Sequence, residues 1–421
     1  MRALYTTLFC LLLPLILLRL WWRGRRAPAY RRRWRERFGL FPAPAPQPAI
    51  WVHAVSVGET IAAAPLVRAL QVRYPEHRLV VTTTTPTGSE RVQALFGDRV
   101  FHVYGPYDTP GCVTRFLDRI RPTLTVVMET ELWPNLIHGC HRRNIPVVVA
   151  NARLSERSAR GYARLGGLTR AMLNEVRLVL AQNAADGERF VALGLPRERL
   201  AVTGSIKFDL TLDDTLTQRA AALRTAGGER SLCWIAASTH EGEDEPALTA
   251  HRALCQRYPD ALLILVPRHP ERFDEVARLI DAQGFRYQRR SQAGEQIDAG
   301  TQVLLGDTMG ELLLLYGCAD VAFVGGSLVE RGGHNTLEPA AWGIPVLTGP
   351  SDFNFSEISR LLGEAGAQVK VANADALAAE LVTLTAQPEL RIRRGAAAQS
   401  VMAANRGALT RHLAALAELI R

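Results

Sequence analysis

The hydrophobic positions in the first half of the chain form short continuous runs, separated by longer stretches with helical periodicity. Apolar runs occupy residues 50–57, 78–85, 99–106, 124–130, 145–153 and 178–183. Helical patterns lie between them, for example over residues 61–73, 88–96 and 109–120. Strands that are apolar on both faces are typical of parallel sheets covered by helices on both sides. The pattern therefore predicts repeated βα units and an α/β fold.

The rhythm breaks in a polar segment, residues 204–230, which contains the sequence AGGER. A second series of apolar runs follows over residues 231–238, 262–270, 301–308, 320–327 and 344–350. A chain of 421 residues is also long for a single core. We expect an N-terminal segment over residues 1–40, one α/β domain over 41–210 and a second over 211–421.

Two α/β domains that face each other would form a cleft. In open parallel sheets, ligands bind at the carboxyl ends of the strands. Polar residues that directly follow an expected strand are therefore the candidates for binding and chemistry.

The first 40 residues have a different pattern. Residues 3–22, ALYTTLFCLLLPLILLRLWW, are long enough to cross a bilayer, although Pro14 and Arg19 interrupt the run. A signal peptide would carry its positive charge before the apolar run and a small-residue cleavage site after it. Here an arginine-rich segment, residues 23–38, follows instead. We expect an uncleaved anchor whose basic side lies in the cytoplasm against anionic lipid, and the pattern leaves open whether it spans the membrane or lies in the interface.

Charge and cysteines narrow the function. Residues 1–40 contain ten arginines and one glutamate, which accounts for the whole net charge of +9 and leaves the remaining chain neutral. A neutral body without interleaved aromatic and basic residues argues against nucleic-acid binding. The six cysteines form no C-x-x-C pair, so reduced structural cysteines are expected.

The second half holds three candidate nucleotide contacts. Arg268 and His269 directly follow an expected strand, where a guanidinium suits phosphate or carboxylate. Met309, Gly310 and Glu311 begin a helix after another strand and could frame a flat base. The glycine-rich stretch FVGGSLVERGGHNTLEPAAWGIPV, residues 323–346, permits close approach of a ligand to the backbone. It contains Asn335, Thr336, Leu337 and Glu338, and Asn335 is expected to open a helix with Glu338 at capping-box spacing.

The first half holds candidate acid–base groups. Ser56 and Glu59 have the spacing of a capping box in SVGET. Glu59 could therefore close a helix or act in catalysis. Glu129 and Glu131 follow the strand expected at 124–130, where carboxylates suit hydroxyl-rich substrates or proton transfer. A structural role for either one alone is equally compatible with the pattern.

Some motifs are missing from the sequence. No G-x-G-x-x-G, phosphate-binding loop or G-x-S-x-G motif occurs, so the sequence lacks the motifs typical of NAD-binding proteins, ATP-binding proteins and α/β-hydrolases. No D-x-D occurs either, and many sugar transferases use that motif to bind a metal with a diphosphate.

Taken in order, eight segments resemble the 3-deoxy-D-manno-oct-2-ulosonic acid (Kdo) transferases of Gram-negative bacteria. They are SVGET, TTTTPTGSERV, METELWPN, NARLSERSARGY, STHEGED, LVPRHPERF, GDTMGELLLLYG and the glycine-rich stretch above. The resemblance spans essentially the whole chain. It implies two Rossmann-like domains of the GT-B type and inverting transfer of Kdo from CMP-Kdo to the lipid A precursor lipid IVA. It also implies action at the cytoplasmic face of the inner membrane, with no metal and no cofactor.

The resemblance also implies residue roles. Glu59 falls at the position of the family's general base. The CMP contacts fall on Arg268 and His269, on residues 309–311 and on residues 335–338, with Thr336 contacting through its backbone. A second essential carboxylate falls on Glu129 or Glu131, and the number of Kdo residues added stays open. We expect Glu59 to point out of the capping box.

Three alternatives are compatible with parts of this pattern. The first is another membrane-associated GT-B transferase that uses a UDP-sugar. The second is a nucleotide-sugar epimerase, which shares the architecture and needs no membrane anchor. The third is a non-enzymatic membrane protein that binds RNA through its arginine-rich segment.

Overall fold

The computed structural model describes residues 1–25, 27–294 and 296–420. The chain forms two compact units. Unit 1 contains residues 1–209 and 406–421, and unit 2 contains residues 210–405. Each unit is built on a sheet of seven parallel strands, as the apolar runs predict.

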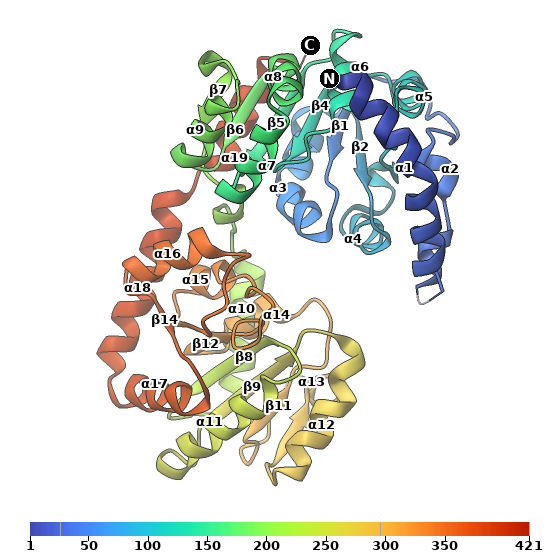
Figure 1. The fold of residues 1–421 in the computed structure, drawn as a ribbon. Coiled ribbons are helices and arrows are strands. Elements are labelled where there is room, and N and C mark those ends of the chain that lie inside the picture. Colours follow the sequence, from blue (N-terminus) through green and yellow to red (C-terminus); the bar gives the residue numbers. More distant parts are fainter. Residues whose placement is uncertain (26, 295, 421) are drawn as a thin grey trace. The chain divides into compact units, whose positions relative to one another are not determined.

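Unit 1 has the strand order β3-β2-β1-β4-β5-β6-β7 (Figure 1). The order reverses beside β1, the arrangement of a doubly wound fold, in which ligands bind at the carboxyl ends of the strands near the reversal. The strands are β1 (Ala49–His53), β2 (Arg78–Thr83), β3 (Phe101–Tyr104), β4 (Pro122–Met128), β5 (Val147–Ala152), β6 (Leu178–Ala181) and β7 (Leu200–Val202).

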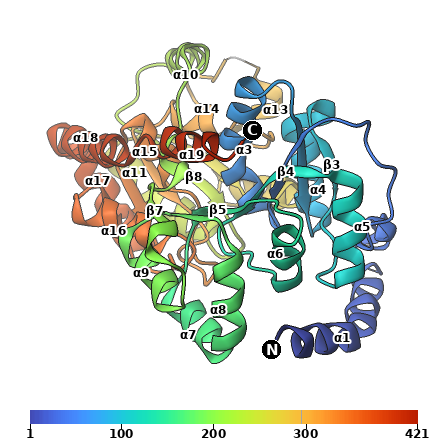
Figure 2. The same ribbon diagram turned by 90° about the horizontal axis from the view of Figure 1, so that it is seen from above.

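Helices cover both faces of this sheet. The helices are α1 (Arg2–Arg23), α2 (Trp34–Arg37), α3 (Val57–Arg73), α4 (Pro86–Phe96), α5 (Pro110–Ile120), α6 (Pro134–His141), α7 (Glu156–Arg164), α8 (Gly166–Glu175), α9 (Ala184–Ala192) and α19 (Ala408–Ala417). Figure 2 shows α3 on one side and α6 and α8 on the other. Trp51 of β1 packs into one core with Ile137 and Met172, while Ile50 packs into the other with Leu66. Alternate strand residues thus supply two separate cores.

The last helix of the chain belongs to unit 1, which corrects the expected second domain of residues 211–421. Asp209 accepts hydrogen bonds from the backbone N–H groups of Gly407 (2.6 Å) and Leu409 (2.5 Å), at the start of α19. His412 accepts a hydrogen bond from the backbone N–H of Asn151 in β5 (2.9 Å). Leu416 is fully buried in the α3 core. These contacts join residues about 200 positions apart, which no local pattern reveals.

Unit 2 has the strand order β10-β11-β9-β8-β12-β13-β14. Its strands are β8 (Cys233–Thr239), β9 (Leu262–Pro267), β10 (Tyr287–Arg289), β11 (Val303–Leu305), β12 (Val321–Val324), β13 (Val346–Thr348) and β14 (Gln368–Lys370). The short edge strands β7, β10 and β14 were not predicted from sequence, because they are partly exposed and so lack a continuous apolar run.

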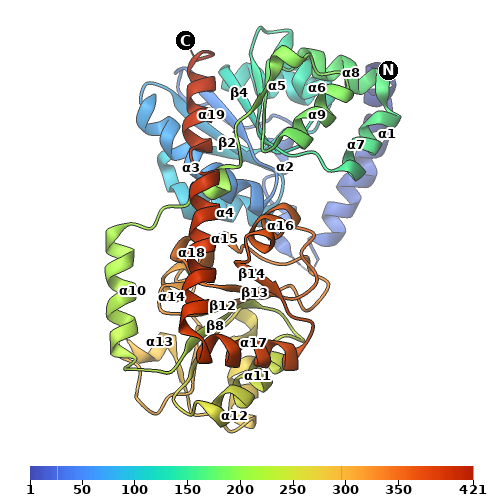
Figure 3. The same cartoon turned by 90° about the vertical axis from the view of Figure 1, so that its left-hand side faces the viewer.

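The helices of unit 2 are α10 (Asp214–Ala226), α11 (Asp244–Arg257), α12 (Phe273–Ala282), α13 (Arg290–Ala293), α14 (Leu312–Tyr316), α15 (Leu337–Trp342), α16 (Ser356–Glu364), α17 (Ala374–Ala386) and α18 (Pro388–Asn405). Leu254, Ile280 and Leu381 form a core on one face of the sheet. Leu223 and Leu315 contribute to the core on the other. The long helix α18 packs beside α15 and α17 (Figure 3).

The N-terminal helix α1 is the one helix of the described residues that is long and apolar enough to cross a membrane. None of its residues is buried. Near its start, Tyr5 donates a hydrogen bond to Asp108 (2.9 Å) and Thr6 donates one to Asn135 (3.0 Å). After its end, Arg33 donates to Ser89 (2.8 Å). The start of the apolar helix and the segment that follows it are therefore attached to unit 1.

Candidate active site

Three glutamates lie at one edge of the unit 1 sheet. Strands β1 and β4 are adjacent and parallel, so the residues that follow them emerge at the same edge. Glu59 is in the first turn of α3, which follows β1, and Glu129 and Glu131 lie directly after β4. The fold brings together the three carboxylates that the sequence proposed as candidates.

Glu59 closes the capping box, and the expectation that it points out of the box is wrong. The Ser56 hydroxyl accepts a hydrogen bond from the backbone N–H of Glu59 (3.3 Å). In return, Glu59 accepts hydrogen bonds from the backbone N–H of Val55 (2.7 Å) and the Ser56 hydroxyl (3.0 Å). The same carboxylate remains partly exposed. Capping a helix and facing solvent are therefore not alternatives here.

The environment of Glu59 favours its neutral form. Burial and the charge of Glu131, with a smaller effect of Glu129, raise the pKa of Glu59 to about 7. The hydrogen bonds from Val55 and Ser56 oppose the shift because they stabilise the carboxylate. A carboxyl group with a pKa near neutrality can accept a proton and hold it, as a general base must.

Glu129 is held by a cation that sequence reasoning missed. Lys207, in the short helix that follows β7, places its Nζ 2.9 Å from Oε1 of Glu129. Glu129 has a left-handed backbone conformation, with φ of 54°. Such a backbone is uncommon for a residue other than glycine and clusters at functional sites. Lys207 has no sequence signal, because it lies in the polar segment 204–230, and only the tertiary structure reveals its partner.

Glu131 has a different set of neighbours. It accepts a hydrogen bond from Nε1 of Trp133 (2.8 Å). Burial raises its pKa, and the charge of Glu129 adds to the shift. Tyr162 of α7 donates to the backbone carbonyl of Thr130 (3.2 Å). An aromatic wall thus lies beside the carboxylates, which suits a sugar that offers hydroxyls on its edge and C–H groups on its face.

In unit 2, the glycine-rich loop after β12 is held by one buried carboxylate. Glu243 is fully buried and accepts hydrogen bonds from the backbone N–H groups of Gly326 (2.6 Å), Ser327 (2.9 Å) and Leu328 (2.9 Å). It also accepts one from the backbone N–H of His240 (2.9 Å). The loops after β8 and β12 are therefore fixed together.

Arg268 follows β9 at the carboxyl edge of the unit 2 sheet, with its side chain exposed. Among the described residues, its guanidinium has no hydrogen-bond or ion-pair partner. The imidazole of His269 packs edge-on against His240, with ring centres 5.4 Å apart. An unpaired arginine at this edge is available to bind an anion.

Residues 309–311 have two different environments: Met309 and Gly310 face solvent, and the Glu311 side chain bonds within the protein. Met309 is 66% exposed, and Gly310 has a φ of 86° with open space around it. Glu311 is engaged within the protein: it accepts a hydrogen bond from Thr308 (2.7 Å) and pairs with Arg290 (3.1 Å). Met309 and Gly310 can contact a ligand directly, whereas the Glu311 carboxylate shapes the turn.

Within residues 335–338, helix α15 begins at Leu337, two residues after the start expected at Asn335. The helix starts at Leu337, whose N–H donates to the Asn335 side chain (3.2 Å). Asn335 also donates to Glu338 (3.0 Å). The Thr336 hydroxyl is buried without a hydrogen-bond partner among the described residues. A buried hydroxyl normally finds a partner, so a side-chain contact to a ligand fits better than the expected backbone contact.

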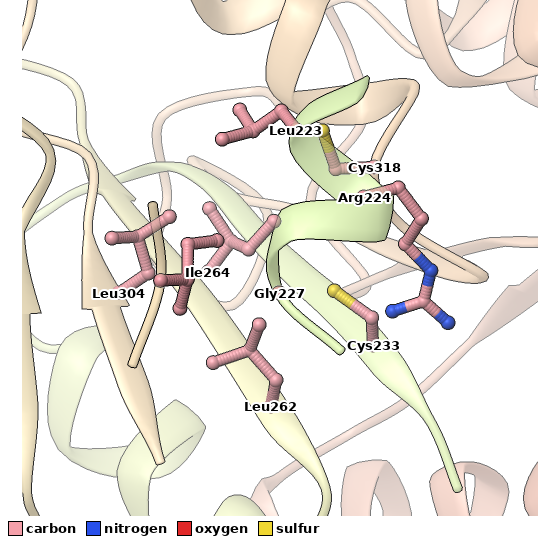
Figure 4. A pocket seen from close by; sticks show the side chains of 9 residues that line it. Leu223, Arg224, Gly227, Cys233, Leu262, Ile264, Leu304 and Cys318 are labelled. Atoms are coloured by element: carbon pink, nitrogen blue, oxygen red, sulfur yellow. The ribbon is translucent and has the colours of Figure 1, made fainter. Parts of the chain in front are cut away.

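A small cavity lies at the opposite edge of the unit 2 sheet. Its lining includes Cys233 at the start of β8 and Leu262 at the start of β9, with Leu223 and Cys318 beside them (Figure 4). Its volume of about 10 Å³ is room for one water molecule. The cavity is therefore too small for a sugar nucleotide.

The described residues contain no group of three or more His, Cys, Asp or Glu side chains placed to hold a metal ion.

The fold has known counterparts. A glycosyltransferase of Rickettsia africae superimposes on 89% of this chain and 99% of its own with a TM-score of 0.59, at 13% identity. Residues 234–401 match the family model described as glycosyl transferases group 1. The protein is thus a glycosyltransferase of the GT-B fold class.

The sequence comparisons identify the family. Residues 32–210 match the model described as 3-deoxy-D-manno-octulosonic-acid transferase. The chain is 50% identical over 416 residues to a 3-deoxy-D-manno-octulosonic acid transferase of Haemophilus influenzae, covering 98% of this chain and 97% of that protein. It is 40% identical to a protein of the same name from Bordetella pertussis, covering 99% and 98%. The chain belongs to the Kdo transferase family, as its motifs predict.

Proposed function

We propose that this Kdo transferase takes Kdo from CMP-Kdo and transfers it, with inversion and without a metal, to the lipid A precursor lipid IVA. The observation that carries the proposal is the cluster of three carboxylates in unit 1, in which Glu59 has a pKa of about 7. The transferase activity of the curated relatives supplies the reaction class.

Unit 2 binds the donor in this proposal. Arg268 pairs with the phosphate, because its guanidinium has no partner among the described residues and follows a central strand. His269, Met309 and Gly310 border the nucleotide. Asn335, Thr336, Leu337 and Glu338 contact the ribose and cytosine, and the unpaired Thr336 hydroxyl supports a polar contact there. Negative charge that develops on the leaving CMP is stabilised by Arg268.

Unit 1 binds the acceptor. A single inverting displacement needs one base to take the proton of the attacking sugar hydroxyl. Glu59 is that base: the charges of Glu131 and Glu129 raise its proton affinity, and its capping bonds hold it in place. Glu129, fixed by Lys207, and Glu131, fixed by Trp133, orient the acceptor and maintain this negative field.

The lipid acceptor requires a membrane, and α1 supplies the contact. Its exposed side chains include Leu8, Leu11, Leu15 and Trp22. Arg23 ends the helix and arginines follow it at residues 25, 31 and 32. Each basic residue near an anionic surface contributes about 1 kcal/mol. We place the protein on the inner membrane with its catalytic body on the cytoplasmic side.

The contacts near the start of α1 favour an orientation along the membrane surface. A helix of 22 residues is about 33 Å long, and the bilayer core is about 30 Å thick. A helix that crossed the bilayer would carry Tyr5 to the far side. Tyr5 instead bonds to Asp108, which is fully buried in unit 1.

The test is transfer by the purified full-length protein from CMP-Kdo to lipid IVA, followed by mass spectrometry of the product. We expect the acceptor mass to increase by one or more Kdo units, CMP to inhibit and UDP to have no effect. Chelation of divalent metals should leave the rate unchanged. Transfer from a UDP-sugar, with inhibition by UDP, would instead support the alternative of another membrane-associated GT-B transferase.

A further inference from the structure

Two histidines of unit 2 form a hydrogen-bonded pair beside Arg268. The Nε2 atoms of His240 and His334 are 2.9 Å apart, and the two rings are nearly parallel, at 11°. His240 follows β8 and His334 lies in the loop after β12, and these strands are neighbours. One Nε2 must donate and the other accept, so the neutral pair shares a single proton.

The surroundings of this pair are positive. Burial, together with the charges of Arg268, His240 and His269, lowers the pKa of His334 to about 4. Burial also lowers the pKa of His240, to which Arg331 and Arg268 contribute, while Glu243 opposes them. Glu243 is the one carboxylate among these influences, and it already accepts four backbone hydrogen bonds.

The pair is also rigid. His240 is fixed through its backbone N–H by Glu243. The His334 ring lies so close to Gly326 that a Cβ at this glycine would come within 2.9 Å of the ring. Gly326 has a φ of 67°, which glycine adopts without strain. Gly326 therefore both forms the turn and leaves room for the imidazole.

The donor sugar carries a second anionic group next to its phosphate. In a CMP-linked ulosonic acid, the anomeric carbon carries both the phosphate oxygen and a carboxylate. A site that holds the phosphate at Arg268 therefore needs a second cationic or hydrogen-donating group next to it. UDP-hexoses lack this carboxylate, so a group that binds it also selects the class of donor.

We propose that His240 and His334 bind the carboxylate of the donor sugar, and so select an ulosonic acid donor over neutral sugars. The proposal rests on the proposed function, because the carboxylate belongs to CMP-Kdo. On binding, one imidazole N–H donates to a carboxylate oxygen, and the negative charge of the ligand offsets the positive field of Arg268 and His269. Arg268 remains with the phosphate.

The test compares the KM for CMP-Kdo with the inhibition constant of CMP, which has the phosphate and no sugar carboxylate. His334→Ala and His240→Ala should each raise the KM about tenfold to a hundredfold, the range of one hydrogen bond to a charged group. The inhibition constant of CMP should stay within about twofold of the wild type. His334→Gln, which keeps a neutral N–H donor near Nε2, should give an intermediate KM.

The matched control is His141→Ala, since His141 is an exposed histidine of unit 1, and both constants should stay unchanged. Unchanged CMP inhibition also shows that unit 2 of each variant is folded. A parallel rise of KM and of the CMP constant, or an unchanged KM in both alanine variants, would overturn the carboxylate assignment alone. A wild-type protein that does not use CMP-Kdo would overturn the proposed function and this inference with it.

Discussion

The Nζ atom of Lys207 lies 2.9 Å from Oε1 of Glu129, although 78 positions separate the two residues in the sequence. This ion pair places one positive charge beside a cluster of three carboxylates. Because burial and the charges of Glu131 and Glu129 raise the pKa of Glu59, the charge balance of the pair influences the group that we propose as the base.

Replacement of Glu59 tests the base directly. Glu59→Gln removes the proton acceptor and keeps an oxygen that can accept the hydrogen bond of Val55, so the helix start is retained. We expect kcat to fall about 10²–10⁴-fold, the usual contribution of a general base, with CMP inhibition unchanged. Glu76→Gln, an exposed glutamate in the same unit, is the control. Near-normal transfer by Glu59→Gln would refute the assignment.

The pH profile should follow the ionisation of Glu59. Only the carboxylate form accepts a proton, so kcat/KM for the acceptor, measured at saturating donor, should fall about tenfold per pH unit below about pH 7. The folded state holds this proton more tightly than the unfolded state. Glu59 therefore lowers the free energy of unfolding as the pH rises from about 4.5 to about 7. A flat rate profile between pH 5 and 8 would exclude Glu59 as the titrating base.

The Lys207–Glu129 pair can be tested by a double-mutant cycle. Lys207→Met leaves the Glu129 charge without its partner, so the midpoint of the pH profile should move upward. Glu129→Gln removes a charge that raises the pKa of Glu59, so the midpoint should move downward. The double variant removes both charges, and its midpoint should differ from the sum of the two single shifts, because residues in direct contact are coupled. A double variant whose shift equals that sum would exclude the coupling.

Orientation of α1 can be measured with reporters fused before Met1. A helix that lies along the cytoplasmic surface keeps the reporter in the cytoplasm, where green fluorescent protein fluoresces and alkaline phosphatase stays inactive. A reporter at the C-terminus is the control for the side of the catalytic body. An N-terminal phosphatase that is active in the periplasm would show that α1 crosses the membrane.

Because α19 packs on unit 1, weakening its attachment should destabilise unit 1. Asp209→Ala removes the acceptor for the backbone N–H groups of Gly407 and Leu409, and should cost unit 1 about 1–2 kcal/mol, as loss of a cap does. Asp214→Ala, at an exposed residue of α10, is the control. Hydrogen exchange measured during thermal unfolding should show that the backbone amides of unit 1 exchange at a lower temperature in Asp209→Ala than in the wild type. A change confined to the amides of unit 2 would contradict the assignment.

The sequence predicted the fold well where strands are long and apolar. The run 124–130 covers most of β4 and the run 262–270 contains β9, because a strand covered on both faces must be continuously hydrophobic. The sequence did not predict the start of α15, since Asn335 and Thr336 both resemble caps and only the backbone conformation chooses between them. The sequence proposed its candidate site residues from their place after strands, and it missed Lys207.

The sequence by itself determined the family, the two parallel-sheet units and the candidates at the strand ends, because these depend on local period and on motif order. The tertiary structure alone decided which distant residues meet. The segment after β7, held to Asn151 of β5, brought Lys207 to Glu129. The adjacent strands β8 and β12 brought His240 to His334, and buried hydrogen bonds assigned α19 to unit 1. It also showed that Glu59 caps its helix while the two neighbouring carboxylates raise its pKa. Such couplings depend on distances between groups that are far apart in the chain, and no local pattern encodes those distances.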